Sequence, residues 1–355
     1  MPRLATFIIA DDLTGALDSV APFAGLGMDC LVATSAGSLS QALAQQPQVL
    51  SVNIGTRELD PETAHNRAEA ATRALEPHAG PNTVWMKKID SRMKGQISAE
   101  VLGVIGVTGA TRVLVCPAIP DLGRIVIDGC LQGEGVGAPI PVDLDLPGDI
   151  SVIRPDARTG ADLDAMVQAA VPGTLLVGAR GLAGALARQS FPGRGGGVAA
   201  MPAGPVGYCI GSRDPITLAQ VDLLARKGDL LCLSAPDGVV PDRLGFSDLL
   251  VVATQGQGAA SSQVSSRLAE GVLDLVGGLT TLVACGGETA AALLRAAGVG
   301  VLRVRGEVLP GLPLCEALDC PGFPALITKS GGFGPPDTLL ALWQAAHRKE
   351  GQPCL

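Results

Sequence analysis

The chain has 355 residues and a formal net charge of −8 at pH 7, from 26 Lys plus Arg against 34 Asp plus Glu. Nucleic-acid-binding proteins usually carry a basic surplus, so this balance argues against that class. Hydrophobic residues make up 47% of the chain and charged residues 17%, which supplies a packed core and excludes a wholly disordered chain. A chain of this length predicts two domains.

The remaining composition indicates a cytoplasmic protein. The nine cysteines are scattered and form no CxxC pair, so we expect reduced thiols. The N-terminal MPRLATFIIADD has an apolar run too short for a signal peptide. No run of about 18 apolar residues is present, so we expect no membrane partner. Most soluble oligomers are symmetric dimers, which makes a homodimer the default expectation, although the sequence reveals no interface.

The first half alternates short apolar runs with helical patterns, which indicates a mainly parallel sheet flanked by helices. The predicted strands are Leu4–Ala10, Cys30–Thr34, Val49–Asn53, Thr83–Lys87, Arg112–Cys116, Ser151–Arg154 and Thr174–Val177. The predicted helices are Leu13–Gly27, Pro61–Pro77, Gln96–Gly106, Ala161–Val171 and Leu182–Gln189. The stretch 117–155 interrupts this rhythm and is predicted to be rich in loops, with a short apolar run at Ile125–Ile127.

A second α/β domain follows a segment rich in Gly, Pro and Ala. The segment 192–205 has no periodicity and is predicted to be a linker between domains 1–191 and 206–350. The strands expected after it are Val206–Ile210, Asp229–Ser234, Leu249–Ala253, Thr281–Cys285, Val301–Val304 and Ala325–Thr328. The helices expected there are Thr217–Lys227, Ala260–Val276, Thr289–Ala297 and Thr338–His347. Two such domains predict an active-site cleft between them.

Ligands of open α/β sheets bind beyond the carboxyl ends of the strands, so the residues that follow each strand deserve most weight. Asp11 and Asp12 follow the first predicted strand, in IIADDLTGALD. One interpretation is that one acid caps the next helix and the other is solvated. The alternative is a carboxylate pair that grips substrate hydroxyls, with one acid able to take a proton.

Two further segments of the first half end a strand with polar groups. KKIDSRMKGQISAE begins at Lys87 and places cations beside Asp90 and Ser91. This mixture suits an anionic, hydroxylated ligand, although Ser91 could instead cap the following helix. Arg57, in NIGTR, offers a guanidinium fork for a carboxylate, but a surface arginine is an equally good interpretation.

The second half has two glycine-rich loops after strands. CGGET contains Gly286 and Gly287 at the start of a helix, whose free N–H groups suit phosphate. The alternative is an ordinary tight turn with Thr289 as the helix cap. TKSGGFG adds a second such loop with one cation, Lys329, and Ser212 offers a smaller possible contact.

Several motifs are absent from the sequence. No GxxxxGK[ST] is present, which excludes a P-loop enzyme, and no GxGxxG lies between a predicted strand and a helix. The three histidines, His65, His78 and His347, lie on or beside predicted surface helices. This placement argues against a Ser-His-Asp hydrolase, and we assign no metal ligand to the protein.

Eight segments in order together resemble the four-carbon acid sugar kinase family. They are IADDLTGALD, NIGTREL, KKIDSRMKG, PAIPDLGRIVIDG, GSRDPITLAQ, GGETAAALL, GEVLPGLPL and KSGGFG. The resemblance covers nearly the whole chain and is weakest between 136 and 204. It implies an N-terminal domain that binds the sugar acid and a C-terminal domain that binds ATP. The implied reaction transfers the γ-phosphoryl group, with Mg²⁺, to the terminal hydroxyl of threonate, erythronate or a 3-oxo-tetronate.

The resemblance also implies roles for individual residues. From the chemistry of carboxylates, we further expect Asp12, with Asp90 as the second candidate, to orient or deprotonate the attacking hydroxyl. The acceptor side would comprise Asp11, Asp12, Arg57, Lys88, Asp90 and Ser91. The nucleotide side would comprise Ser212, Gly286, Gly287, Glu288, Thr289, Gly331 and Gly332, to which the cation of the last glycine-rich loop adds Lys329.

One turn departs from the family pattern. The family usually has Asp-Ser-Thr-Leu-Arg-Gly-Asn, whereas this chain has Asp-Ser-Arg-Met-Lys-Gly-Gln from Asp90 to Gln96. Because the turn Arg92–Gln96 is altered, a kinase for a related hydroxylated acid such as 4-hydroxythreonine is an alternative. A dinucleotide-dependent oxidoreductase and a non-catalytic sugar-acid sensor are alternatives of other classes.

Overall fold

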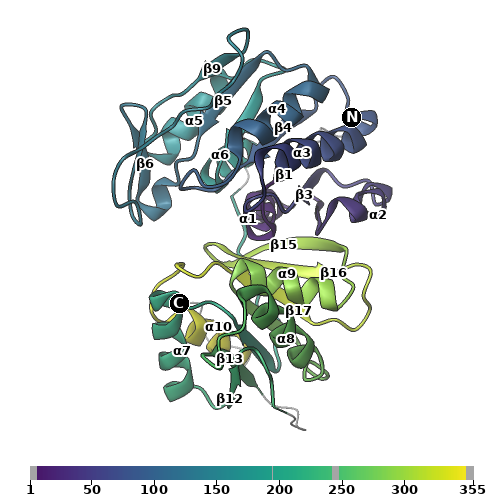
Figure 1. Ribbon diagram of the computed structural model, residues 1–355, viewed down its shortest axis with the longest axis vertical. Helices are drawn as coiled ribbons and strands as arrows, with labels where there is room; N and C mark the ends of the chain where they lie inside the picture. The colour runs from purple at the N-terminus through teal and green to yellow at the C-terminus, as the bar shows by residue number, and fades with distance from the viewer. Residues whose placement is uncertain (1–5, 194, 242–247, 349–355) are drawn as a thin grey trace. The chain divides into compact units, whose positions relative to one another are not determined.

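The computed structural model describes residues 6–193, 195–241 and 248–348. The chain divides into two compact units, unit 1 (Met1–Gly197) and unit 2 (Val198–Leu355) (Figure 1). The division falls inside the segment 192–205 that the sequence predicts to be a linker. Each unit contains a sheet flanked by helices, so the predicted α/β class is confirmed.

The main sheet of unit 1 is parallel throughout. Its order is β2-β3-β1-β4-β10-β5-β9, and each neighbouring pair within it runs parallel. The strands are β1 (Thr6–Ala10), β2 (Cys30–Ala33), β3 (Val49–Asn53), β4 (Val84–Lys88), β5 (Arg112–Cys116), β9 (Ser151–Ile153) and β10 (Leu175–Gly178). Most are short and buried, as expected for strands covered on both faces.

Two groups of helices cover this sheet. The helices are α1 (Leu13–Gly25), α2 (Leu39–Ala44), α3 (Pro61–Leu75), α4 (Ile97–Thr108), α5 (Gly160–Ala169) and α6 (Arg180–Ser190). Helix α6 packs against α1 and α5, while α3 packs against α4. Right-handed crossovers explain this grouping, because β1 connects toward one edge of the sheet whereas β3 and β4 connect toward the other. Short 3₁₀ turns lie at Ala36–Ser38, Glu76–His78 and Pro120–Leu122.

The stretch predicted to be rich in loops contains a small antiparallel sheet, which corrects that expectation. Its strands are β6 (Arg124–Ile127), β7 (Cys130–Gly133) and β8 (Ile140–Pro141). Asp128 and Gly129 form the tight turn between β6 and β7, with φ of 50° and 69°. This small sheet is separate from the main one and carries Arg124 at its first position.

Unit 2 has a mixed sheet of order β12-β13-β11-β14-β17-β16-β15. The strands are β11 (Val206–Ile210), β12 (Leu231–Pro236), β13 (Leu249–Thr254), β14 (Thr281–Cys285), β15 (Val301–Leu309), β16 (Leu312–Ala317) and β17 (Ala325–Lys329). The first five strands in this order, β12, β13, β11, β14 and β17, pair in parallel. Strands β15 and β16 form an antiparallel hairpin, which the sequence-based prediction of a single strand at Val301–Val304 did not include.

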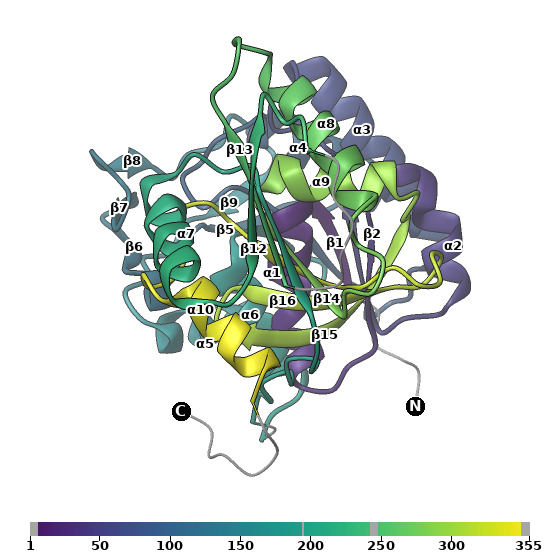
Figure 2. The same ribbon diagram turned by 90° about the horizontal axis from the view of Figure 1, so that it is seen from below.

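The helices of unit 2 also form two groups (Figure 2). They are α7 (Pro215–Lys227), α8 (Ser261–Leu273), α9 (Gly287–Ala296) and α10 (Thr338–Ala346). Helix α7 packs against α10, and α8 packs against α9. Tyr208 is buried at the centre of the core and donates a hydrogen bond of 3.1 Å to the main-chain oxygen of Leu339 in α10.

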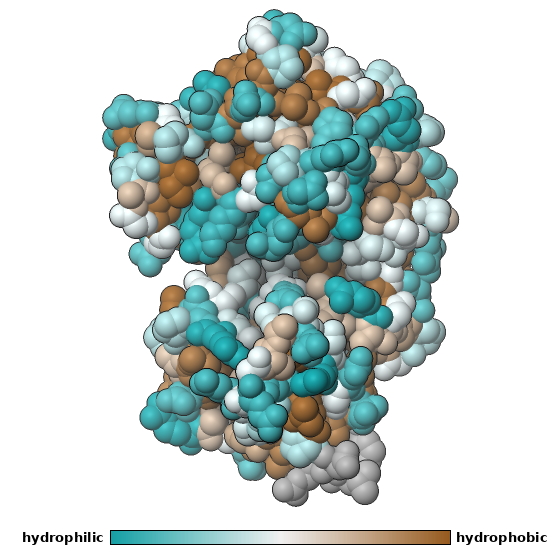
Figure 3. Space-filling view, in the orientation of Figure 1, coloured by the Kyte–Doolittle hydropathy of each residue, from teal (hydrophilic) through white to brown (hydrophobic). Residues whose placement is uncertain are grey.

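The surface and the thiols agree with a packed α/β protein. Figure 3 shows hydrophilic side chains over much of the visible face of each unit, interrupted by small hydrophobic areas. Within the described part of the chain, no helix combines the length and apolarity needed to cross a membrane. The eight cysteines that the structure describes are free thiols.

Candidate functional site

The connections of unit 1 diverge between two central strands. Strand β1 leads through α1 toward β2, whereas its neighbour β4 leads through α4 toward β5, on the other side of the sheet order. Ligands of doubly wound sheets bind at the carboxyl ends of strands at such a switch point. Asp11 and Asp12 follow β1, and Lys88 ends β4 directly opposite Ala10. The fold therefore brings together two segments that are far apart in the sequence and were each predicted to bind substrate.

Arg57 connects three carboxylates at this switch point. Its Nε lies 2.8 Å from Asp11 Oδ2, and its Nη1 lies 2.9 Å from Asp12 Oδ2. The same Nη1 lies 3.6 Å from Asp90 Oδ2. The predicted fork for a ligand carboxylate is thus occupied by carboxylates of the chain, and these acids raise the pKa of Arg57 despite its burial. Arg57 holds the acids in place, which corrects the interpretation of a surface arginine.

Asp11 is the most buried member of this cluster. Its side chain is 1% exposed, and its Oδ1 has no hydrogen-bond partner among the residues that the structure describes. Burial raises the pKa of Asp11, but Lys87, Lys88 and Arg57 lower it by more, so the net pKa lies below the ordinary value. A charged carboxylate with one unused buried oxygen can accept a hydrogen bond from a hydroxyl.

Asp12 caps a helix, as one interpretation of the sequence expected, and it also remains partly exposed. It is the N-cap of α1, where its Oδ1 accepts a 2.8 Å hydrogen bond from the N–H of Gly15. Its Oδ2 accepts hydrogen bonds from the Thr14 hydroxyl at 2.7 Å and from Arg57. The side chain remains 21% exposed, so a capping residue is still accessible to a substrate.

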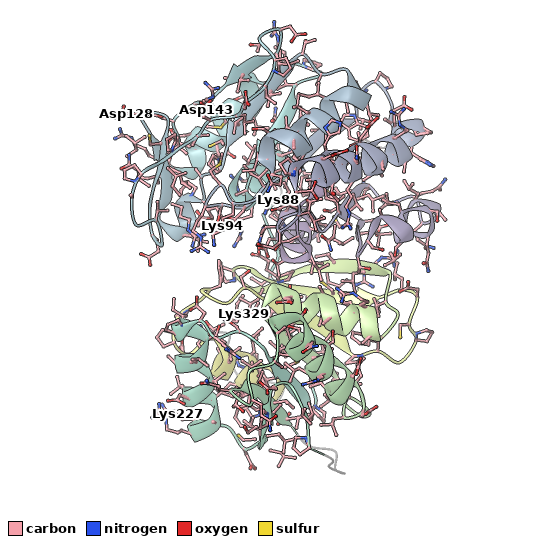
Figure 4. All side chains as sticks on the ribbon, viewed as in Figure 1. Lys88, Lys94, Asp128, Asp143, Lys227 and Lys329 are labelled. Carbon is pink, nitrogen blue, oxygen red and sulfur yellow. The ribbon has the colours of Figure 1, made fainter. Side chains whose placement is uncertain are left out.

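The two consecutive lysines of β4 have different environments. The Lys88 ammonium donates to the main-chain oxygen of Ile89 at 2.9 Å and lies beside the first turn of α1, against Gly15 (Figure 4). The Lys87 ammonium is 0% exposed and lies 2.9 Å from Glu100 Oε2. Lys87 is therefore held in an internal ion pair.

Glu100 is a residue of this site to which no role was assigned from the sequence. It belongs to α4, is 1% exposed and accepts hydrogen bonds from Lys87 and from the Thr56 hydroxyl. The N–H of Thr56 in turn donates to the main-chain oxygen of Asp11 at 3.0 Å. Glu100 thus lies beneath the cluster and fixes Thr56, the neighbour of Arg57. A sequence signal for such a residue was available. Consecutive lysines in a strand point to opposite faces, so one of the two needs a partner other than the ligand.

The turn after β4 is anchored to the small antiparallel sheet. Asp90 Oδ1 accepts the N–H of Arg92 at 2.8 Å, and the Ser91 hydroxyl accepts a 2.8 Å hydrogen bond from Arg124 Nη1. Helix α4 begins at Ile97, so Ser91 is not its cap. Arg124 lies in a segment that carried the resemblance, but it was not among the site residues predicted from the sequence.

Unit 2 has a switch point of the same kind. Strand β11 leads through α7 to β12, and its neighbour β14 leads through α9 toward β15. Ser212 follows β11, Gly286 follows β14, and Ser330 follows β17, the next strand in the order. The N–H groups of Gly211 and Ser212 donate to the Cys285 oxygen at 3.2 Å each, and Gly286 N–H donates to the Lys329 oxygen at 2.9 Å. The three strand ends are therefore joined directly.

Glycine is required at two positions of this edge. Gly286 has a φ of 110°, a region in which side chains are rarely accommodated. A Cβ on Gly331 would lie 2.6 Å from Ser212 Oγ. Helix α9 begins at Gly287 without a side-chain cap, so the N–H groups of its first turn can serve an anion. Thr289 is buried and is not the cap, which corrects that alternative.

Lys329 lies beneath its loop. It is 1% exposed, and its ammonium donates to Thr217 Oγ1 at 3.0 Å and to the main-chain oxygens of Ser330 and Gly331 at 3.1 Å each. Burial lowers the pKa of Lys329, although Cys285 and Asp214 act in the opposite direction. Its three protons each have a protein acceptor, so its contacts hold the loop. Glu288 is exposed and accepts from the Ser261 hydroxyl at 2.9 Å.

Comparison with known proteins gives consistent matches for both units. Residues 6–141 match a family model described as a sugar-binding N-terminal domain, and residues 242–339 match one described as a nucleotide-binding C-terminal domain. The chain is 30% identical to D-threonate kinase of Cupriavidus necator, over 96% of this chain and 98% of the relative. It is 26% identical to 3-oxo-tetronate kinase of Methylobacterium radiotolerans, over 94% and 97%.

A solved structure of a Salmonella typhimurium LT2 protein, provisionally described as a tRNA synthase, shares the fold. It superimposes with a TM-score of 0.72 at 17% identity, over 97% of this chain and 99% of that one. Full-length similarity to a relative at 30% identity extends this agreement from fold to family. The resemblance read from eight short motifs is confirmed: the chain belongs to the four-carbon acid sugar kinase family and is a kinase.

Proposed function

We propose that this kinase transfers the γ-phosphoryl group of ATP to the terminal hydroxyl of a four-carbon sugar acid of the threonate, erythronate or 3-oxo-tetronate class. The observation that carries the proposal is the cluster of Asp11, Asp12, Asp90 and Arg57 at the switch point of unit 1. It lies within the segment that matches a sugar-binding model. Carboxylates held in this way accept hydrogen bonds from hydroxyl groups.

Asp12 is our candidate for the group that receives the proton. The acceptor oxygen forms a bond to the γ-phosphorus, the bond from that phosphorus to the β–γ bridging oxygen breaks, and ADP leaves. The hydroxyl proton passes to a carboxylate oxygen of Asp12, which is partly exposed and held by Arg57. Asp90, also within reach of Arg57, is the second candidate.

The phosphates would bind at the switch point of unit 2. The first turn of α9, at Gly287 and Glu288, offers main-chain N–H groups, and the loop at Gly331 and Gly332 offers more. Lys329 would act through this loop, because its ammonium already binds two of the loop's carbonyl oxygens.

Mg²⁺ would be shared between the phosphates and a carboxylate. In the described residues no group of three or more His, Cys, Asp or Glu could hold a metal ion by itself. Asp214 fits a shared ion, since its Oδ1 caps α7 while its Oδ2 lies close to the loop, 3.1 Å from a Cβ built on Gly332. Oxygen ligands suit this cation, which would neutralise charge on the transferred phosphate.

A panel assay tests the proposal. The purified full chain is mixed with ATP, Mg²⁺ and D-threonate, L-threonate, D-erythronate, a 3-oxo-tetronate or 4-hydroxythreonine, and ADP release is measured. We expect ADP to be released only when a tetronate is present. If none of the acids leads to ADP release, the proposal is refuted. Release with 4-hydroxythreonine alone would favour the alternative that the altered turn Arg92–Gln96 suggests.

Two matched variants test the role of Asp12. Asp12→Asn should lower turnover by about 10²-fold or more if Asp12 receives the proton. Asp60→Asn is the control, because Asp60 is also a helix N-cap, accepting from the N–H of Thr63 at 2.9 Å, but is exposed at the start of α3. Both variants weaken a cap, so unchanged turnover in Asp12→Asn would remove Asp12 from this role.

A further inference from the structure

Two arginines lie near Asp90 and Ser91 and are close enough to each other for their charges to interact. Arg92 is exposed, and among the described residues its guanidinium has no hydrogen bond or ion pair. Arg124 is half-buried, and its Nη1 and Nε donate to the Ser91 hydroxyl at 2.8 Å and to the main-chain oxygen of Glu134 at 2.9 Å. Both acceptors of Arg124 are neutral, so neither guanidinium has a carboxylate in contact.

The local charge is unbalanced as a result. Burial lowers the pKa of Arg124, and the neighbouring positive charge of Arg92 lowers it further, while Asp90 and Glu134 raise it by less. The Asp90 carboxylate is already used, since Oδ1 accepts the Arg92 N–H and Oδ2 lies 3.6 Å from Arg57 Nη1. A half-buried guanidinium beside a second one is costly unless an anion lies between them.

The surroundings add positive charge and hold Arg124 in place. Lys94 belongs to the same turn and is exposed (Figure 4). In the same orientation, Figure 3 shows hydrophilic residues gathered at that margin of unit 1. The Arg124 backbone is fixed in the small sheet by a reciprocal pair of hydrogen bonds with Ile119, of 2.9 and 3.2 Å. The Arg124 fork is therefore positioned before any ligand arrives.

We propose that Arg92 and Arg124 together bind the carboxylate of the acceptor, and that Arg92 determines specificity for an acid over a neutral polyol. This inference rests on the proposed function and assigns the acid end of the substrate. A guanidinium has only donors, arranged in a fork that matches a carboxylate, whereas hydroxyl groups suit the mixed donors and acceptors nearer Asp90. The acceptor would thus extend from the arginine pair past Asp90 toward Asp12.

The assignment also ranks the acceptors. An α-amino acid carries an ammonium beside its carboxylate, and that ammonium would approach two guanidinium groups and Lys94. Positive charges that lie close together repel one another. We therefore expect 4-hydroxythreonine to bind more weakly than a tetronate. This argues against the alternative substrate that the altered turn first suggested.

Titration calorimetry without nucleotide tests the arginine pair separately from catalysis. The wild-type chain, Arg92→Met, Arg92→Lys and Arg124→Met are titrated with D-threonate and with threitol, its counterpart without a carboxylate. We expect each Met variant to bind D-threonate about 10- to 100-fold more weakly, as for loss of a charged hydrogen bond. Arg92→Lys should recover part of the affinity, and threitol binding should not change. Arg112→Met is the matched control. Arg112 is exposed at the first residue of β5, whereas the site lies at the carboxyl ends of the strands.

The outcomes separate this inference from the proposed function. D-threonate affinity in Arg92→Met equal to that of the wild type would overturn the inference, and so would wild-type binding of D-threonate no stronger than that of threitol. Inorganic phosphate that binds in an Arg92-dependent way where D-threonate does not would also overturn it. Absence of ADP release with every acceptor refutes the proposed function instead. Arg92 is exposed, so its variants test the idea even if Arg124→Met fails to fold.

Discussion

Gly15 offers a sharp test of the cluster in unit 1, because it has no side chain where two charged groups meet. It lies in the first turn of α1, and a Cβ built on it would lie 2.5 Å from Asp12 Oδ1 and 2.6 Å from Lys88 Nζ. Real Cβ atoms essentially never approach closer than 3.0 Å. Gly15→Ala must therefore displace the carboxylate, the ammonium or both by about 0.5 Å.

The magnitude follows from two opposing effects on stability and one on activity. Alanine within a helix is favoured over glycine by about 1 kcal/mol, while overpacking costs about 1–3 kcal/mol. The free energy of unfolding should therefore fall by no more than about 2 kcal/mol. A displacement of about 1 Å in a reacting group can cost about 10²-fold in rate, so we expect kcat/KM to fall by about 10- to 100-fold.

The assay is acceptor-dependent ADP release, with thermal unfolding measured on the same preparations. Gly106→Ala is the control, because Gly106 also lies in a helix of unit 1 but a Cβ built on it would have no atom within 4 Å. That variant should keep its activity and gain up to about 1 kcal/mol of stability. A folded Gly15→Ala variant with wild-type kcat/KM would show that Asp12 and Lys88 need not keep their present positions.

Three further predictions concern both units. In Gly331→Ala the added Cβ would lie 2.6 Å from Ser212 Oγ. This variant should raise the KM for ATP about tenfold or more and leave the KM for the acid unchanged. Equal effects on the two KM values would place this loop outside the nucleotide site. Lys329→Met removes the ammonium that binds two loop carbonyls, and should cost about 1–3 kcal/mol in urea unfolding; an unchanged midpoint would contradict a holding role. The pKa of Asp11 is lowered on folding, so its stabilising contribution is present above its ordinary value of 3.8 and is lost as the pH falls below that value. In Asp11→Asn the free energy of unfolding should therefore depend less on pH in the acid range. If the variant and the wild type show the same pH dependence, Asp11 does not make this contribution.

The strands of the parallel sheets could be predicted closely from the sequence. Strands β3, β5, β11 and β14 begin and end at the residues expected for them. Each is a run of five residues, largely apolar and buried. The turns after β3, β11 and β14 contain glycine and polar residues, and β5 is followed by Pro117. A strand covered on both faces must be continuously apolar, so its limits are visible in the sequence itself.

The antiparallel pairs were missed, although each carried a local signal. Asp128-Gly129 between two apolar runs is the strongest short hairpin signal, because both positions take positive φ in a tight turn. Pro310-Gly311 similarly separates β15 from β16. These segments were assigned to loops or to a single strand because neighbouring glycines and prolines masked the alternation. Helix α2 (Leu39–Ala44) is too short to show a helical period.

Which residues gather at the site could be predicted, but their contacts could not. Within each unit, the carboxyl ends of the parallel strands meet at one edge of the sheet. Asp11 and Asp90 in unit 1, and Ser212 in unit 2, were therefore identified from their position after a strand. Contacts such as Arg57 to Asp11, or Arg124 to Ser91, join residues 46 and 33 positions apart. Such pairings depend on how the strands and turns are packed, and a single sequence holds no record of that packing.

Lys87 and Lys88 show how finely the fold separates structure from chemistry. They are adjacent in β4, so their side chains must point to opposite faces of the sheet. One face is covered by α4, which supplies Glu100, and a lysine buried there needs that carboxylate, because an unpaired charge in the interior is strongly destabilising. The other face meets the first turn of α1, where Gly15 leaves room for an ammonium beside Asp12. A shift of one residue in the register of β4 would exchange the two roles. The pairing of β4 with β1 therefore determines which lysine pairs with Glu100 and which lies beside Asp12.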